Sequence, residues 1–156
     1  MPPSQTKTSA AAIAVVLAVT AGGVALAQTA AQNAVAARQA GFKTMGAAFK
    51  AVNDELKKGQ PDMKVVAAQS RTVNVQAHAL PGWFAKGSGA ESGAKTKAKA
   101  EIWTDSDTFA AAARALQTET AKLQSLAAGG DAGAVRDQVR AVGAACGNCH
   151  KPFRAD

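Results

Sequence analysis

A seam of large side chains recurs every three or four positions in the first half of the chain. Its members are Val35, Arg38, Phe42, Met45, Phe49, Val52 and Leu56, and all but Arg38 are apolar. This spacing places the seam on one face of an α-helix and is typical of a helix in a bundle. It predicts a helix over about residues 34–58, ended by Gly59 with Pro61 just beyond.

The same periodicity predicts a second helix after this break. Asp62 is the candidate N-cap, and the helix continues to Leu80, where Pro81 follows. Its apolar face is thinner than that of the first helix and comprises Met63, Val66, Ser70, Val73, Ala77 and Leu80.

Two more helices are predicted in the C-terminal third. Thr104 is placed to cap the third helix, with Asp107 three positions on, and a glycine pair at 129–130 ends it. Its buried side is predicted to hold Phe109, Ala112, Leu116, Leu123 and Leu126. The fourth helix starts near Asp131 and carries one stripe of Val135, Val139, Val142, Cys146, Cys149 and Phe153.

A long connection, residues 81–100, separates the second and third helices. Its glycines, serines and lysines predict an exposed segment, and Trp83, Phe84 and Trp103 are expected to anchor it by packing. Four helices with one long connection predict an all-α fold, an antiparallel up-down four-helix bundle.

The N-terminal residues predict export from the cytoplasm. Residues 1–27 combine Lys7, an apolar run over 10–19 and the triplet Ala25-Leu26-Ala27, which together predict a secretory signal peptide cleaved before Gln28. The apolar run is too short for an uncleaved membrane anchor. We therefore expect one domain, residues 28–156, in the periplasm, with no membrane attachment after cleavage.

The net charge of the chain limits the classes of binding partner that we expect. The net charge is +7, and aromatic residues make up only 4% of the chain. The basic residues are scattered over the predicted helices, which favours a solvated surface and acidic partners over nucleic-acid binding.

The segment Cys146-Gly147-Asn148-Cys149-His150 carries the chemistry. Cys-x-x-Cys-His is the pattern by which haem is attached covalently through two thiols, with the imidazole as axial iron ligand. On a helix these three side chains share one face. The pattern predicts one haem c per chain, held near one end of the bundle, with His150 on the iron.

The sequence gives less support to other roles for the two cysteines. A thioredoxin-like dithiol normally follows a strand, and no strand is predicted. A closed zinc site needs four ligands, and the only other histidine is His78. A structural disulfide leaves His150 unexplained. His78 is also considered as a second axial ligand, although a single helical histidine is more often a surface or core residue.

Arg38 interrupts the apolar seam of the first helix. A guanidinium in that position either pairs with an anion, for which a haem propionate is suited, or packs its stem while its head reaches water. The sequence leaves both alternatives open.

Taken together, these segments resemble the cytochrome c′ family, the class II c-type cytochromes. The resemblance rests on the pairs and motifs Arg38-Gln39, Ala79-Leu80-Pro81, Glu101-Ile102-Trp103 and the run from Val142 to His150. It implies that His150 is the proximal ligand and that Arg154 lies beside the proximal face. It also implies that Arg38 lies near a propionate and that Phe42 lies over the distal face.

The resemblance makes Phe42 the residue that decides function. Relatives with a methionine near this position are six-coordinate and low-spin, whereas phenylalanine cannot ligate iron. We therefore expect five-coordinate, high-spin iron beneath an apolar roof that favours NO and CO, and a role in NO scavenging or buffering.

The alternative function is a low-spin, six-coordinate electron carrier with a periplasmic redox partner. Met45, three residues after Phe42, is its candidate ligand, although a core methionine is the simpler interpretation. No acid/base constellation accompanies the haem motif, so we do not expect an enzyme. The resemblance also implies a homodimer formed through the first two helices.

Overall fold

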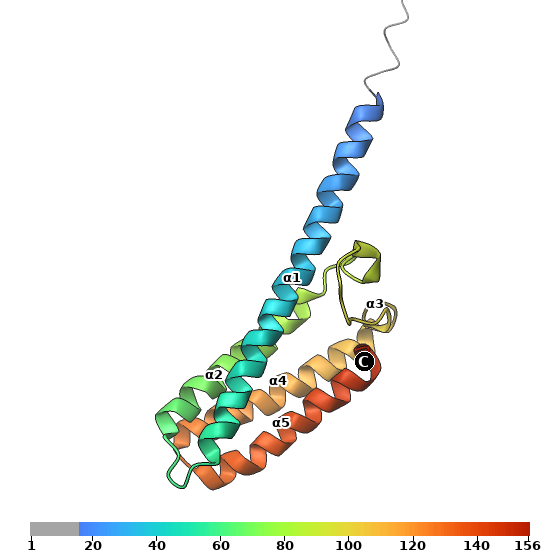
Figure 1. Ribbon diagram of the computed structural model, residues 1–156. Coiled ribbons are helices and arrows are strands. Elements are labelled where there is room, and N and C mark those ends of the chain that lie inside the picture. Colours follow the sequence, from blue (N-terminus) through green and yellow to red (C-terminus); the bar gives the residue numbers. More distant parts are fainter. Residues whose placement is uncertain (1–15) are drawn as a thin grey trace, which may run out of the picture.

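The computed structural model describes residues 16–156, with side-chain environments from residue 30 onward. Its four long helices are α1 (Val16–Leu56), α2 (Met63–Ala79), α4 (Ser106–Gly129) and α5 (Ala132–Phe153). Two 3-10 helices, η1 (Leu80–Trp83) and η2 (Ala90–Ser92), and the short helix α3 (Glu101–Thr104) lie between α2 and α4. The long helices alternate in direction and form the predicted antiparallel four-helix bundle (Figure 1).

Helix α1 begins earlier than predicted. The sequence pattern placed its start near residue 34, but the helix starts at Val16. The added stretch is rich in alanine and contains no proline, so the helical hydrogen-bond ladder continues despite the glycines at 22–23. In Figure 1 this part of α1 extends beyond the other helices. The predicted signal peptide covers residues 1–27, of which the first fifteen lie outside the described residues.

Two of the predicted helix starts are confirmed by their caps. The side chain of Asp62 accepts hydrogen bonds from the backbone of Lys64 (2.9 Å) and Val65 at the start of α2. Asp131 accepts from Gly133 (2.9 Å) and Ala134 (3.0 Å) at the start of α5. Each cap satisfies backbone donors that a helix leaves unpaired at its N-terminus.

The predicted Thr104 cap is wrong. Thr104 is the last residue of α3, and its hydroxyl donates to the carbonyl of Ala100 (3.3 Å). Asp105 takes the N-cap position of α4 instead, without a capping hydrogen bond from its side chain. The C-terminal end agrees with the prediction, because Gly130 adopts a left-handed conformation (φ 79°) that ends α4.

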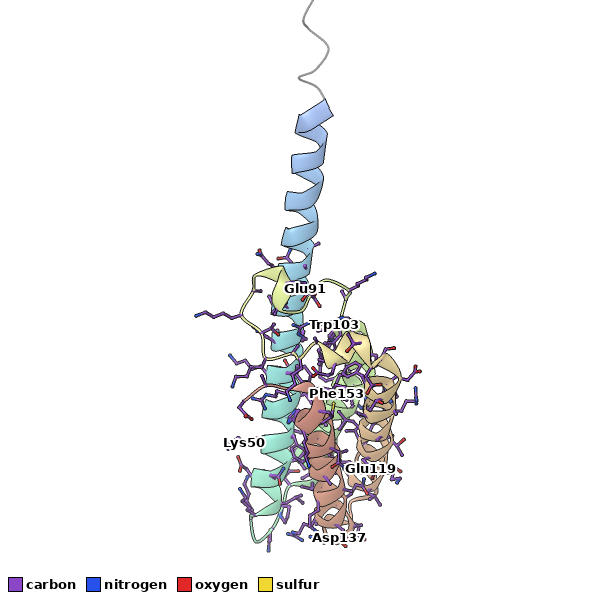
Figure 2. All side chains as sticks on the ribbon, turned by 90° about the vertical axis from the view of Figure 1, so that its right-hand side faces the viewer. Lys50, Glu91, Trp103, Glu119, Asp137 and Phe153 are labelled. Atoms are coloured by element: carbon purple, nitrogen blue, oxygen red, sulfur yellow. The ribbon has the colours of Figure 1, made fainter. Side chains whose placement is uncertain are left out.

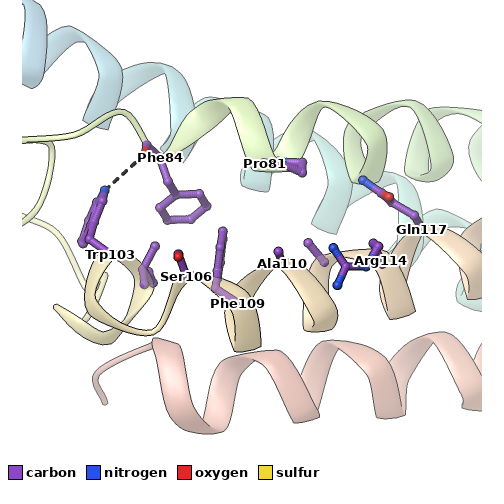
Figure 3. A pocket seen from close by; sticks show the side chains of 10 residues that line it. Pro81, Phe84, Trp103, Ser106, Phe109, Ala110, Arg114 and Gln117 are labelled. Carbon is purple, nitrogen blue, oxygen red and sulfur yellow. Dashed lines mark hydrogen bonds between the residues drawn. The ribbon is translucent and has the colours of Figure 1, made fainter.

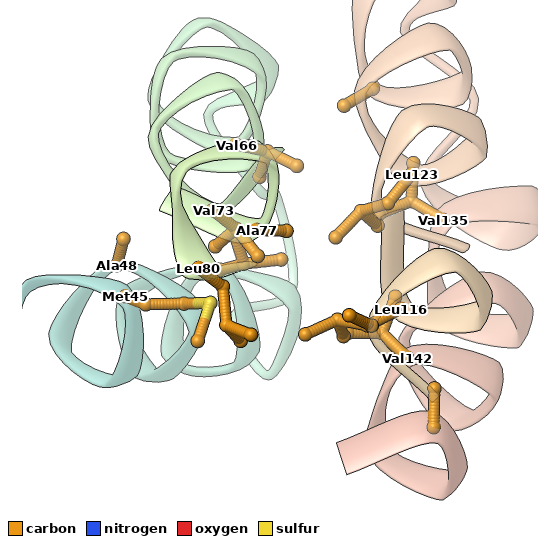
Figure 4. Packing of buried hydrophobic residues seen from close by; sticks show 14 of the residues in the cluster. Met45, Ala48, Val66, Val73, Ala77, Leu80, Leu116, Leu123, Val135 and Val142 are labelled. Carbon is orange, nitrogen blue, oxygen red and sulfur yellow. The ribbon is translucent and has the colours of Figure 1, made fainter. Parts of the chain in front are cut away.

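The apolar core fills one half of the bundle. Val52, Val66, Leu123 and Val135 have no exposed surface at all. They come from the end of α1, the start of α2, the end of α4 and the start of α5, which the antiparallel arrangement brings together. Figure 4 shows the facing layers of this cluster. The packed half therefore leaves the other end of the bundle for the cavity described below.

Charged side chains cover the outside of the bundle. Lys50 and Asp137 lie on the outside of the bundle (Figure 2), and each forms an ion pair with a residue three or four positions away on its own helix. Such exposed pairs contribute little to stability. Among the described residues, none of the helices combines the length and apolarity needed to cross a bilayer.

The connection between α2 and α4 is not exposed throughout, contrary to prediction. Ser88, Gly89 and Ser92 are buried, because this segment lies against α1. Gln32 donates to the carbonyl of Ser92 (3.2 Å), and Gln39 donates to the carbonyl of Lys95 (2.8 Å). The serines thus serve as anchors that the Gly- and Ser-rich composition did not predict.

Candidate haem site

A cavity of about 1060 Å³ occupies the half of the bundle that the packed core leaves open. It lies between α1 and α5, with one side chain from α2, two from α4, and the connection closing one edge. All six residues that the sequence analysis assigned to the haem line it: Arg38, Phe42, Cys146, Cys149, His150 and Arg154. Residues more than a hundred positions apart are therefore brought to one site, as the resemblance implied.

The haem-attachment motif lies on the last two turns of α5. Cys146 and Cys149 are half-buried and unbridged, and His150 is exposed at the cavity. Burial raises the pKa of both thiols, and at Cys149 the neighbouring Cys146 adds to that effect. Burial and the charge of Arg154 lower the pKa of His150, which favours the neutral imidazole, the form that ligates a metal.

These residues fit a covalently attached haem. Two thiols and an imidazole on one helix face open into the cavity, whose volume lies at the upper end of the range for ligand pockets. Gly143, in the turn before the motif, also lines the cavity and adds no side chain to it. The site therefore offers three attachment points and space for a flat group the size of a porphyrin.

The chain terminus holds this end of α5 against the connection. Ala98 and Arg154 form an isolated antiparallel bridge, Lys99 donates its backbone N–H to the carbonyl of Phe153 (3.0 Å), and Ala155 donates to the carbonyl of Lys97 (2.8 Å). The pairing brings Lys97 and Arg154 to the same edge of the cavity.

Arg38 is buried, so the alternative in which its head reaches water is wrong. Only 2% of its surface is exposed. Its guanidinium donates to the hydroxyl of Ser88 (3.0 Å), to the carbonyl of Ser88 (2.9 Å) and to the hydroxyl of Thr96 (2.8 Å). It also lies 4.9 Å from the centroid of the Phe84 ring.

The surroundings of Arg38 leave its charge without a direct ionic contact. Burial lowers the pKa of Arg38, and the negative charge of Glu91 partly offsets this effect. A cation held by neutral acceptors at the edge of a cavity is suited to receive an anionic group there. That Arg38 binds a haem propionate stays a prediction. Its position in the cavity wall agrees with that role.

Phe42 is held in the cavity wall by two other aromatic rings. Trp83 packs edge-on against it, with ring centroids 5.0 Å apart, and the Phe84 centroid lies 6.2 Å away. Trp83 reaches this position because residue 41 is glycine, where an added Cβ would lie 2.4 Å from the indole ring. The ring of Phe42 is thus fixed by Trp83 and by Phe84, itself a cavity-lining residue, which the sequence assigned only to general packing.

Met45 and His78, the two other candidate ligands, differ in position. Met45 lines the same cavity and is 8% exposed, and it belongs to the core cluster together with Leu80 and Val142 (Figure 4). His78 is exposed on α2 and does not line the cavity. Only Met45 therefore stays a possible iron ligand on the α1 side.

The charged residues that line the cavity are all basic. Lys43, Lys95 and Lys97 join Arg38 and Arg154, and the lining includes no carboxylate. Sequence reasoning noted the connection lysines but could not place Lys95 and Lys97 at this edge, since the hydrogen bonds that fix them join residues more than fifty positions apart.

Comparisons with known proteins agree on one family. The family described as Cytochrome C' matches residues 33–154. A cytochrome c′ of Rhodospirillum rubrum is 33% identical over 108 residues, which are 69% of this chain and 72% of that protein. The cytochrome c′ structure from Thermochromatium tepidum superimposes with a TM-score of 0.74 at 28% identity, covering 81% of this chain and 97% of that one.

Two solved variants of an Alcaligenes xylosoxidans cytochrome c′ are similar to the same degree. One is a nitric oxide complex and the other has carbon monoxide bound. Each has a TM-score of 0.73 and 26% identity, and each match covers 81% of this chain and 97% of the other.

Proposed function

The chain belongs to the cytochrome c′ family, and on that premise we propose that it is a periplasmic haem protein that binds NO and CO and scavenges or buffers NO. The family implies a c-type haem. When bound, haem c supplies an iron centre that can take a diatomic gas. The proposal concerns which residues of this chain hold that centre and which ones select its ligand.

Each site residue has a role that its position supports. Cys146 and Cys149 form the two thioether links, and His150 ligates the iron from the α5 side. Arg38, held by Ser88 and Thr96, receives a propionate, and Arg154 supplies a positive charge beside His150. With Phe42 in the opposite wall, the iron of a bound haem would have no sixth protein ligand and would be five-coordinate and high-spin.

The position of Phe42 is the observation that carries the proposal. Its ring lines the cavity on α1, the helix across the cavity from His150, and Trp83 and Phe84 hold it there. A phenyl ring neither ligates iron nor donates a hydrogen bond. An apolar roof without a donor favours neutral diatomics over water and anions, which need hydrogen bonds or charge compensation when buried.

Replacing the roof tests this role. Phe42→Ala should speed CO association with the ferrous protein by roughly tenfold, equivalent to a barrier lowered by about 1.4 kcal/mol. Phe49→Ala is the matched control, because Phe49 lines the same cavity from the same helix but lies about 10 Å further along it. Equal rates in wild type and Phe42→Ala, or equal acceleration in both variants, would show that Phe42 is not the roof.

A low-spin electron carrier is the second candidate function, and Met45 favours it. Its thioether lines the haem cavity one turn from Phe42 and belongs to a class of side chain that ligates haem iron. The basic residues around the cavity would suit an acidic redox partner in either case.

Three further features complete the proposal. The predicted signal peptide and haem attachment support a periplasmic location. Val65 and Val75 on α2, 38% and 55% exposed, support a homodimer that covers this helix. We propose no catalytic turnover, and the described site supplies haem ligands and basic residues without an acid/base pair.

A further inference from the structure

A second, smaller cavity adjoins the haem cavity. Its volume is about 350 Å³, and it lies between η1, α3 and α4 (Figure 3). Three side chains, Phe84, Ile102 and Phe109, line both cavities. These three residues therefore form a wall that the two spaces share.

The two phenylalanines form the aromatic part of this wall. Their ring centroids are 4.9 Å apart at an angle of 72°, and Phe84 also packs against Phe42 at 6.2 Å. The wall thus leads to the same side of the haem cavity as the Phe42 ring.

Phe84 is the one of the two that lies outside a long helix. It follows η1 in irregular backbone, whereas Phe109 is 8% exposed within α4. The carbonyl of Phe84 accepts a hydrogen bond from the indole N–H of Trp103 (3.1 Å, dashed in Figure 3). Its backbone is therefore anchored at this wall, and its ring is half-buried.

The lining of the smaller cavity suits an apolar occupant. Pro81, Trp103, Ala110 and Ala113 contribute mainly hydrocarbon surface. Of the polar lining residues, Gln117 turns its amide toward α2, where it donates to the carbonyl of Ala77 (3.3 Å). The other polar lining residues, Ser106 and Arg114, are exposed, so the space opens to solvent on their side. Spaces lined by hydrocarbon bind small apolar molecules, xenon included.

We propose that the smaller cavity is a docking site for small neutral gases, which pass from it into the haem cavity between Phe84 and Phe109. The passage rests on the proposed gas-binding function, whereas the docking site does not depend on it. NO and CO are uncharged and apolar enough to enter this space, while the basic edge of the haem cavity favours anions.

Xenon tests the docking site without reference to the haem iron. Crystals of the holoprotein pressurised with xenon should show a xenon peak among Trp103, Phe109 and Ala113. Crystals of Ala110→Phe, in which a ring fills the cavity, should lose this peak. Xenon density elsewhere in the protein but none in this cavity would overturn the docking site.

Rapid mixing of the ferrous protein with CO tests the passage. Ala110→Phe should slow CO association about threefold, a barrier raised by about 0.65 kcal/mol, with an unchanged absorption spectrum. Ala110 lines only the smaller cavity, so the haem surroundings stay intact. Ala111→Phe makes the same change at the next, exposed position of α4 and should keep the wild-type rate.

The two experiments separate this inference from the proposed function. If Ala110→Phe and Ala111→Phe bind CO at the same rate, the passage is overturned, but the proposal that the haem binds gas is not affected. A wild-type protein that binds no CO would overturn the proposed function and the passage together, and the xenon density would still decide the docking site.

Discussion

At the scale of single residues, two side chains of α1 are candidates to lie nearest the iron on the side opposite His150. They are Phe42, which cannot ligate iron, and Met45, which can. Phe42 is held by Trp83 and Phe84, and Met45 packs into the apolar cluster that also contains Leu80. The Phe42 contacts favour an open iron site. Met45 would have to leave well-packed apolar surroundings to ligate, at the cost of the contacts it makes there.

Met45→Leu separates these two possibilities. Leucine conserves the volume and apolar character of methionine, so the change should cost less than about 1.5 kcal/mol of stability. If Met45 is a core residue, the spin state and absorption spectrum of the ferric protein stay those of wild type. A change from a low-spin to a high-spin spectrum would identify Met45 as the iron ligand.

The residues that bear chemistry were predictable where the signal is local. Spacing alone predicts the role of Cys146, Cys149 and His150, and all three line the cavity in the structure. The partners of Arg38 were not predictable, because Ser88 and Thr96 lie fifty and fifty-eight positions away. Neither serine nor threonine in a polar loop indicates which buried group it will contact.

At the scale of elements, the turn between α1 and α2 depends on one carboxylate that the sequence analysis did not single out. Glu55 is buried, and its side chain accepts from the ammonium of Lys58 (2.6 Å) and from the backbone N–H of Asp62 (2.8 Å). These two hydrogen bonds lower the pKa of Glu55 below its usual range. The carboxylate thereby links the end of α1 to the N-cap of α2.

Glu55 should give the protein a measurable pH dependence. A depressed folded-state pKa contributes stability that is complete above the unfolded pKa and is lost as the pH falls through the folded one. Glu55→Gln keeps an acceptor for the Asp62 N–H but loses the charge, so it should lower Tm by a few degrees near neutral pH. Thermal unfolding followed by circular dichroism, at neutral pH and at an acidic pH below the depressed pKa of Glu55, should show the difference shrink at the acidic pH. A difference that is the same at both pH values would contradict this role.

Element boundaries could be predicted where a specific residue marks them. Asp62, Asp131 and Gly130 act as the sequence indicated. Thr104 failed because α3 ends there and its hydroxyl bonds within that helix. The start of α1 was missed because the sequence analysis assigns residues 1–27 to a signal peptide, and the alanine-rich stretch beyond continues the same helix.

At the scale of the whole molecule, the bundle is packed at one end and hollow at the other. The antiparallel order was predictable from four periodic segments and their connections, but the separation of α1 from α5 was not. These helices have few residues in contact, and the cavity lies between them. The chain therefore positions Phe42 and His150 on opposite walls of one space.

The central claim is that the wall opposite His150 leaves the iron without a sixth protein ligand. The most direct test is the absorption spectrum of the purified protein, ferric and then ferrous with and without CO and NO. The account predicts a high-spin ferric haem and clear spectral changes when either gas is added to the ferrous protein. A low-spin ferric haem with a methionine-to-iron charge-transfer band, and no CO binding after reduction, would contradict it.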